Sequence, residues 1–187
     1  MQTFKTFFYS FLLLMTAWNA APVLAKPGTI QFINCRWDID GRKWKTLGYN
    51  MNGPEGLVQF IPEENQGKNW KEFVSMQWYE NRNTSQKMQF EIFIEDLQGM
   101  WPDQNVSANI ISESNLALIG EWWTDGSTTK SPYYGLVKIF NLNGDIYLLT
   151  YTACDSETAT VAKSKWLPIF RLAILNYGEL ERKKVLQ

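Results

Sequence analysis

The chain has 187 residues, with 18 Lys and Arg, 19 Asp and Glu and no His, which gives a net charge of −1 at pH 7. A balance this close to neutral excludes a strongly basic surface for nucleic acid or for an anionic membrane. The absence of His excludes Ser-His-Asp and Cys-His catalysis, His-ligated zinc and the usual general base near neutral pH. No phosphate-binding or dinucleotide-binding glycine motif is present. We therefore expect no catalytic residues, no metal and no cofactor.

The first 25 residues have the pattern of a cleavable secretory signal peptide. Lys5 precedes an apolar run over residues 7–17, and Val23 and Ala25 are small residues at the third and first positions before a cleavage site. The run is shorter than the roughly 20 residues of a membrane span, although an uncleaved anchor is the alternative. We expect cleavage after Ala25, no integral membrane association afterwards, and one periplasmic or secreted domain over residues 26–187.

Both cysteines, Cys35 and Cys154, lie in the predicted mature domain. An even pair in an exported protein favours one disulfide, and both cysteines lie in strand-like segments that could be neighbours. The bond would close a long loop, which the chain-entropy description values at roughly 4 kcal/mol. The alternative is two buried free thiols. We expect the disulfide.

Three β-rich runs open the mature domain, over residues 29–37, 42–51 and 56–62. Asp40-Gly41 between the first two predicts a hairpin turn, because Gly accepts the positive φ that such a turn requires. Asn52-Gly53-Pro54 predicts a second turn. Asn69 can cap a short helix over residues 70–74, and alternation then predicts a strand over residues 75–79.

A helix follows from Thr84 or Ser85, its predicted N-cap, and ends near Gly99, at the latest at Pro102. Its apolar positions are Met88, Ile92, Phe93, Leu97 and Met100. Four more strands are predicted, over residues 106–114, 116–124, 136–142 and 145–153. Asn143-Gly144, between the last two, is a strong hairpin signal, and Ser114-Asn115 is a plausible tight turn.

The last predicted element is a helix from near Ser156 to about Tyr177. Pro168 should kink this helix or delay its start. Its apolar stripe consists of Val161, Lys165, Trp166, Ile169, Phe170, Ala173 and Ile174. The resulting order is β-β-β-α-β-α-β-β-β-β-α. Strands in meanders predict an antiparallel sheet with helices packed on it, which is the α+β class.

Carboxylates are the remaining candidates for catalysis. Asp38 and Asp40 flank a predicted turn, Asp155 and Glu157 follow the last strand, and Glu121 lies on a strand. A glycosidase needs two carboxylates across a cleft, and sequence alone does not bring any two together. Asp38-Ile39-Asp40-Gly41 also has the start of a calcium loop, but it lacks the later ligands of an EF-hand. A carboxylate-dependent hydrolase is thus our third hypothesis.

Aromatic residues flank one polar loop, in the stretch GEWWTDGSTTKSPYYG over residues 120–135. On a strand, Trp122 and Trp123 must point to opposite faces, and so must Tyr133 and Tyr134. One of each pair can belong to the core. The other two meet a covering helix, solvent or a ligand, and exposed aromatic residues of this kind are favoured at protein interfaces. We therefore name these four as candidate binding residues.

The run FIPEENQGKNWKEFVSMQW over residues 60–78 resembles a passage of exported PsbP-like proteins, which include the extrinsic photosystem II subunit. The same fold is shared by a yeast nuclear import factor that binds Ran and by small exported bacterial proteins of unknown role. The resemblance extends to about Tyr177. Its residues are Trp70, Glu72, Asn143-Gly144 with Tyr147, and Trp166.

The resemblance implies an α/β/α sandwich around an antiparallel sheet. Members of the family mostly act as binding or assembly factors and differ in partner, so the resemblance implies no particular activity. The histidines linked to metal in photosynthetic members have no counterpart here. We expect a non-enzymatic exported protein that binds a protein partner. The alternative is a carbohydrate or small-ligand module that uses the aromatic loop.

Overall fold

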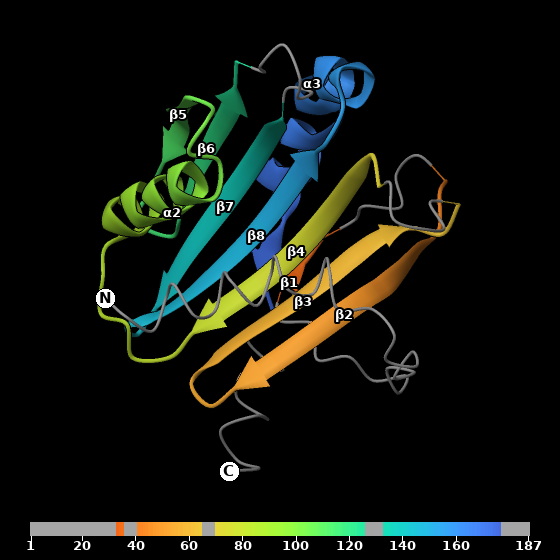
Figure 1. Ribbon diagram of the computed structural model, residues 1–187. Helices are drawn as coiled ribbons and strands as arrows, with labels where there is room; N and C mark the ends of the chain where they lie inside the picture. The colour runs from red at the N-terminus through yellow and green to blue at the C-terminus, as the bar shows by residue number, and fades with distance from the viewer. Residues whose placement is uncertain (1–32, 36–40, 65–69, 126–132, 177–187) are drawn as a thin grey trace.

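The computed structural model describes residues 33–35, 41–64, 70–125 and 133–176 (Figure 1). The predicted signal peptide lies outside these residues. The elements in chain order are β1 (Ile33–Asn34), β2 (Trp44–Asn52), β3 (Glu55–Pro62), β4 (Glu72–Tyr79), α2 (Gln86–Met100), β5 (Val106–Glu113), β6 (Ala117–Thr124), β7 (Tyr134–Leu142), β8 (Asp145–Ala153), α3 (Ser156–Leu172) and β9 (Ile174–Leu175).

Seven strands form one antiparallel sheet in the order β2-β3-β4-β8-β7-β6-β5. Within this sheet, strands that follow one another in the chain pair with each other, except that β4 pairs with β8 and not with β5. This pairing joins the meander β2-β3-β4 to the meander β5-β6-β7-β8. The remaining strands, β1 and β9, pair with each other in a separate two-stranded ladder. The predicted α+β class with an antiparallel sheet is confirmed.

Helices α2 and α3 pack against opposite faces of the sheet (Figure 1). Helix α3 lies over β7 and β8, where Trp166 and Phe170 are fully buried. Helix α2 lies over β5, β6 and β7, with Phe90 and Leu97 against them. Since strand side chains alternate between faces, β6, β7 and β8 contribute to both cores. Each strand residue is thereby assigned to one side or the other.

The predicted turns and the first helix cap have the expected backbone. Asn143 and Gly144 both have positive φ, 54° and 90°, and they join β7 to β8. Gly53 has φ 61° between β2 and β3. Ser85 caps α2, since its hydroxyl accepts a hydrogen bond from the Met88 amide at 3.1 Å. These local predictions hold because the required backbone geometry and cap chemistry depend on few neighbouring residues.

Two local predictions are wrong. Residues 70–74 do not form a helix, because β4 begins at Glu72 and pairs along its length with β8. Ladder pairing on a central strand outweighs the weak helix signal of a single Asn cap. The hairpin predicted at Asp40-Gly41 is also wrong for the described residues, which include Gly41 but not Asp40. Gly41 does have positive φ, but β1 pairs with β9 rather than with β2.

The last helix begins at Ser156 as predicted and runs through Pro168 to Leu172, short of the predicted end. Its buried side differs in part from the predicted stripe, since Val161 is 53% exposed. The C-terminal end of α3 is held by Lys138 of β7. The Lys138 ammonium donates hydrogen bonds to the carbonyls of Phe170, Arg171 and Ala173 at 2.9, 3.3 and 2.8 Å. Burial lowers the pKa of Lys138, against a smaller opposing effect of Cys35.

The predicted disulfide is wrong, because Cys35 and Cys154 are both free thiols. Cys35 directly follows β1, which pairs with β9 just beyond the end of α3. Cys154 instead lies before Asp155, the N-cap of the same helix. A helix of 17 residues spans about 25 Å, whereas a disulfide needs Cα atoms within about 7 Å. Burial raises the pKa of each thiol to about 12.

Candidate functional site

Neighbouring tryptophans on β6 have opposite environments. Trp122 points toward α2 and is 1% exposed, whereas Trp123 points to the α3 side and is 39% exposed. Tyr134 pairs directly with Trp123 across the β6–β7 ladder. Tyr133 packs with the α2-side cluster instead. The sheet therefore divides the four predicted binding residues into two pairs, and only one pair contains a partly exposed tryptophan.

The α2-side pair is part of an aromatic stack. Trp101, at the end of α2, lies between Trp122 and Tyr133, with ring centroids 5.4 and 4.7 Å away. Gly135 lets the Trp122 ring lie against β7, because a Cβ there would come within 2.3 Å of the indole. Such stacking adds to area burial as a stabilising term. Trp122 and Tyr133 thus have a packing role that accounts for their presence.

The α3-side pair surrounds a buried carboxylate. Glu121 is 6% exposed, and strand alternation puts it on the same face as Trp123. The Tyr134 hydroxyl donates to Glu121 Oε2 at 3.0 Å, and Lys163 of α3 approaches the same oxygen at 2.8 Å. Asn109 of β5 donates to Oε1 at 3.4 Å. Four elements thereby meet at one carboxylate.

Electrostatics keep this carboxylate charged. Burial alone would raise the pKa of Glu121, but the hydrogen bonds from Lys163, Tyr134 and Asn109 outweigh burial, and the pKa is lowered. Burial and the hydrogen bond to Glu121 both raise the pKa of Tyr134, so its hydroxyl stays a donor at neutral pH. A carboxylate whose pKa is lowered stays ionised at neutral pH, where a general acid would have to carry a proton. Such a carboxylate is well suited to hold its neighbours in one geometry.

We call this group the Trp123 surface and define it as Trp123, Tyr134, Glu121, Lys163 and Asn109. Sequence reasoning named Trp123 and Tyr134 as binding residues and noted Glu121 on its strand. It missed Lys163 and Asn109, whose positions depend on the packing of α3 and the register of β5. The alternation of β6 was the one available signal, because it assigns Glu121 and Trp123 to the same face.

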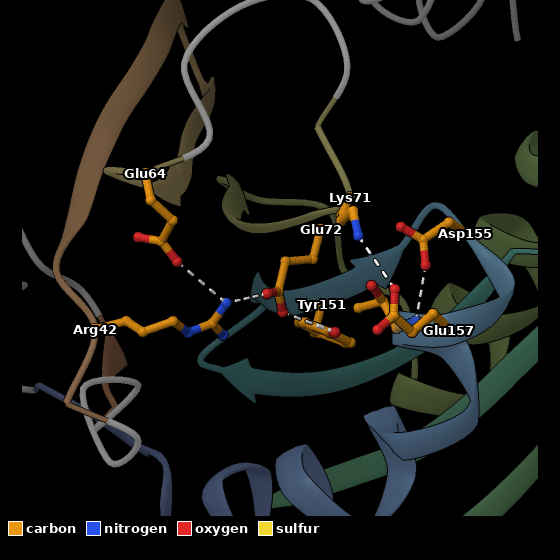
Figure 2. A network of polar contacts seen from close by, with 8 residues as sticks. Arg42, Glu64, Lys71, Glu72, Tyr151, Asp155 and Glu157 are labelled. Carbon is orange, nitrogen blue, oxygen red and sulfur yellow. Dashed lines mark hydrogen bonds and ion pairs between the residues drawn. The ribbon is translucent and has the colours of Figure 1, made fainter.

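A second polar cluster lies on the same α3 face of the sheet, toward the β2 edge, and joins Arg42, just before β2, to Glu72 of β4 and Tyr151 of β8 (Figure 2). Glu72, 5% exposed, forms an ion pair with Arg42 and accepts a hydrogen bond from the Tyr151 hydroxyl at 2.9 Å. Arg42 also approaches Glu64 at 3.6 Å. Burial and the charge of Glu72 strongly raise the pKa of Tyr151, so Tyr151 remains a donor.

Aromatic rings enclose the buried side of this cluster. Tyr151 stacks on Trp166 of α3 at 4.3 Å, and Trp44 of β2 contacts Trp166 edge-on at 5.5 Å. The Arg42 guanidinium lies over the Trp44 ring at 5.3 Å. Two residues that carry the PsbP-like resemblance, Glu72 and Trp166, therefore meet through Tyr151. The contacts tie an edge strand, the sheet centre and α3 together, which is a stabilising arrangement.

The other carboxylates predicted as candidates have structural partners or lie outside the described residues. Asp155 caps α3 by accepting from the Thr158 amide at 2.8 Å, and Glu157 pairs with Lys71 at 3.2 Å (Figure 2). Asp38 and Asp40 fall in the stretch that the structure does not describe. No pair of carboxylates across a cleft emerges within the described ranges.

Within the described part of the chain, no cluster of three or more His, Cys, Asp and Glu residues could hold a metal ion. An open hollow of about 460 Å³ lies near the Arg42 cluster, lined by Lys43, Lys45, Glu63 and Glu64. Among the described helices, none is long and apolar enough to cross a membrane.

No family model matches the sequence of this chain, and no curated protein matches it.

Proposed function

We propose that this chain is an exported, non-enzymatic protein that binds a protein partner through the Trp123 surface. The observation that carries the proposal is the environment of Trp123. Its ring is 39% exposed, while the neighbouring Tyr134 and Glu121 are held by hydrogen bonds. A large aromatic side chain on a rigid strand loses little conformational entropy when it is covered by a partner.

The surroundings of Trp123 favour a protein over a small molecule. Small-ligand sites are concave and enclose most of their ligand. Trp123 lies on a sheet face instead, with Ser107 beside it on β5 and Tyr134 beside it on β7. Protein interfaces commonly centre on one exposed aromatic anchor with polar groups around it. Glu121 and Lys163 supply such polar groups.

A carbohydrate is the second candidate ligand. The indole ring of Trp123 offers an apolar face, and Asn109 and Lys163 offer hydrogen-bond donors nearby. Sugars stack on flat aromatic rings and hydrogen-bond at their rims. Isothermal titration calorimetry with a glycan panel tests this candidate. A saturable heat change that Trp123→Phe keeps and Trp123→Ala abolishes would favour the glycan over a protein.

The proposed function is tested by affinity capture from an envelope extract with three baits: the wild type, Trp123→Ala and Tyr49→Ala. Tyr49 is 53% exposed on β2, at the other edge of the sheet, so it is a matched control for loss of an exposed aromatic residue. We expect a partner that the wild type and Tyr49→Ala retain and that Trp123→Ala loses. Identical captures by all three baits contradict the proposal. So does a turnover activity abolished by one Asp or Glu substitution.

Export is part of the proposal, and it is supported by the sequence pattern of the first 25 residues. Expression of the full chain followed by N-terminal sequencing of the exported product tests it. We expect a mature terminus at Lys26. A product that begins at residue 1 and sediments with membranes would instead support an uncleaved anchor.

The fold family is also proposed as PsbP-like. Supporting features are the antiparallel sheet with helices on both faces and the contact of Tyr151 with both Glu72 and Trp166. Superposition of an experimental structure on a PsbP domain tests the assignment. A different strand order in the PsbP sheet would exclude it.

A further inference from the structure

Strand β5 forms one edge of the seven-stranded sheet, next to the Trp123 surface. Its eight residues read VSANIISE, with a single charged side chain, Glu113, at the end. Exposed sheet edges usually carry Lys, Pro or a covering element, because their unpaired backbone groups attract other strands. Strand β5 contains neither Lys nor Pro.

The hydrogen-bond pattern identifies which backbone groups face outward. The Val106 amide donates to the side chain of Gln98 at 2.9 Å, so it is directed away from β6. Thr124 pairs with Val106 across the ladder, and the Thr124 amide donates to the Tyr133 carbonyl on the opposite side of β6 at 3.0 Å. In an antiparallel ladder, alternate residues repeat this orientation. The amides and carbonyls of Ala108 and Ile110 therefore point outward from the edge.

Among the described strands, only β6 pairs with β5, which leaves the outer side of β5 open. Two features limit this open edge to a short segment. At one end, the Val106 amide already donates a hydrogen bond to the Gln98 side chain, so it is not available to an incoming strand. At the other end, a β-bulge between Ile110 and Ser112 shifts the register. A bulge interrupts continuous pairing and discourages extended sheet-to-sheet contact. What is left is a window over residues 106–110, long enough for a few residues of an incoming strand.

Trp123 can reach across this window. Only Ser107 separates Trp123 from the edge on the α3 face, since these two residues pair across the β5–β6 ladder. Adjacent strands lie about 4.8 Å apart, and a serine side chain is too small to screen an indole from the next strand. An incoming side chain beside Ser107 can therefore pack against Trp123.

Charges at the two ends of the window indicate the chemistry of the partner. Asp125 is exposed near the Val106 end, where Asn105 donates a hydrogen bond to it at 3.1 Å, and Glu113 is exposed beyond the bulge. Lys163 is already paired with Glu121 on the α3 face. The ends of the window are thus acidic, which favours Lys or Arg at the ends of an incoming segment.

We propose that an extended segment of the partner protein adds to the sheet at residues 106–110 of β5, with an apolar side chain against Trp123 and basic residues toward Asp125 and Glu113. This rests on the proposed function and specifies its mode. Main-chain hydrogen bonds to Ala108 and Ile110 supply affinity, and the contact with Trp123 supplies selectivity, as in other cases of strand addition.

The test uses a phage-displayed library of random linear 12-residue peptides as the probe, panned on the exported protein. The selected peptides are measured against Ala108→Pro, Ala108→Val and Trp123→Ala. Proline removes the outward amide but no ladder bond, so the sheet should tolerate it at an edge, and valine is the matched control that keeps the amide. We expect Ala108→Pro to weaken binding about tenfold or more, with Ala108→Val near wild type.

Hydrogen exchange provides a second readout that does not depend on any variant. Bound peptide should slow exchange of the Ala108 and Ile110 amides, and the selected sequences should share an apolar residue with flanking Lys or Arg. Binding that needs Trp123 but ignores Ala108→Pro and leaves these amides unprotected overturns strand addition and leaves the proposed function standing. Failure to select any peptide whose binding depends on Trp123 contradicts both strand addition and the proposed function. Concentration-dependent dimers that block the peptides would make a second copy the occupant and overturn the proposal.

Discussion

The contact between Lys138 and the end of α3 gives a sharp test of how this fold is held together. Lys138 is 7% exposed, and its ammonium donates to three carbonyls at the C-terminus of α3. Lys138→Met keeps most of the side-chain volume but removes all three donors. The perturbation therefore isolates the polar contact from the packing of the aliphatic stem.

The magnitude follows from opposing terms. Hydrogen bonds to a charged group contribute roughly 1.5–3 kcal/mol each, and a cation at a helix C-terminus adds up to about 2 kcal/mol. Burial of the ammonium cancels part of this gain. We expect Lys138→Met to lower the free energy of unfolding by about 2–4 kcal/mol, because buried carbonyls of Phe170 and Ala173 lose their donor.

Urea unfolding followed by circular dichroism measures this change, with thermal melts as a second estimate. At about 2–4 °C per kcal/mol for a domain of this size, the melting temperature should fall by roughly 4–16 °C. Lys87→Met on the exposed side of α2 is the matched control and should change stability by less than about 0.5 kcal/mol. A loss below about 1 kcal/mol for Lys138→Met would refute the reasoning, since the helix end would then not depend on the ammonium.

Further predictions concern the tryptophans, one carboxyl and the thiols. Trp122→Ala should cost about 3–5 kcal/mol in urea unfolding, and Trp123→Ala less than about 1 kcal/mol, because the first ring is buried and the second is 39% exposed; equal losses would contradict their assignment to opposite environments. Burial raises the pKa of Asp96 to about 7, from a usual value of 3.8, against the opposing charge of a nearby arginine. A raised folded-state pKa contributes stability below the unfolded value, and that contribution is lost as the pH rises through about 7. Asp96→Asn should therefore gain stability relative to wild type between pH 4 and pH 8, and a pH-independent difference would count against burial of this carboxyl. Finally, a thiol reagent in denaturant without reductant should titrate both Cys35 and Cys154, and no reactive thiol would indicate a disulfide.

The PsbP-like resemblance concerns a short run of residues and the order of elements, whereas the structure gives the contacts between those elements. The resemblance was based on the run over residues 60–78 and on the order of elements. After β4, the structure has the predicted order of helix, four strands and helix. It also shows that Tyr151 contacts both Glu72 and Trp166. It also replaces the short helix within that run by the first residues of β4. The family remains a proposal.

The amino-acid sequence by itself determined most of the elements and turns. The strands over β5 to β8, the Ser85 cap and the Asn143-Gly144 turn depend on alternation, side-chain capping and positive φ. Each is a short-range property. The division of Trp122 and Trp123 between two faces follows from the same alternation, and it could be stated without knowing which face would be buried.

Tertiary structure alone decided how these elements meet. Pairing of β4 with β8, and of β1 with β9, joins residues far apart in the chain, and no local pattern encodes such partners. The same pairings put Cys35 and Cys154 at opposite ends of α3. They also bring Lys163 to Glu121, since a helix docking over β7 determines which strand residues it can reach. Long-range pairing is selected by the burial of the whole sheet, which is a property of all the strands together.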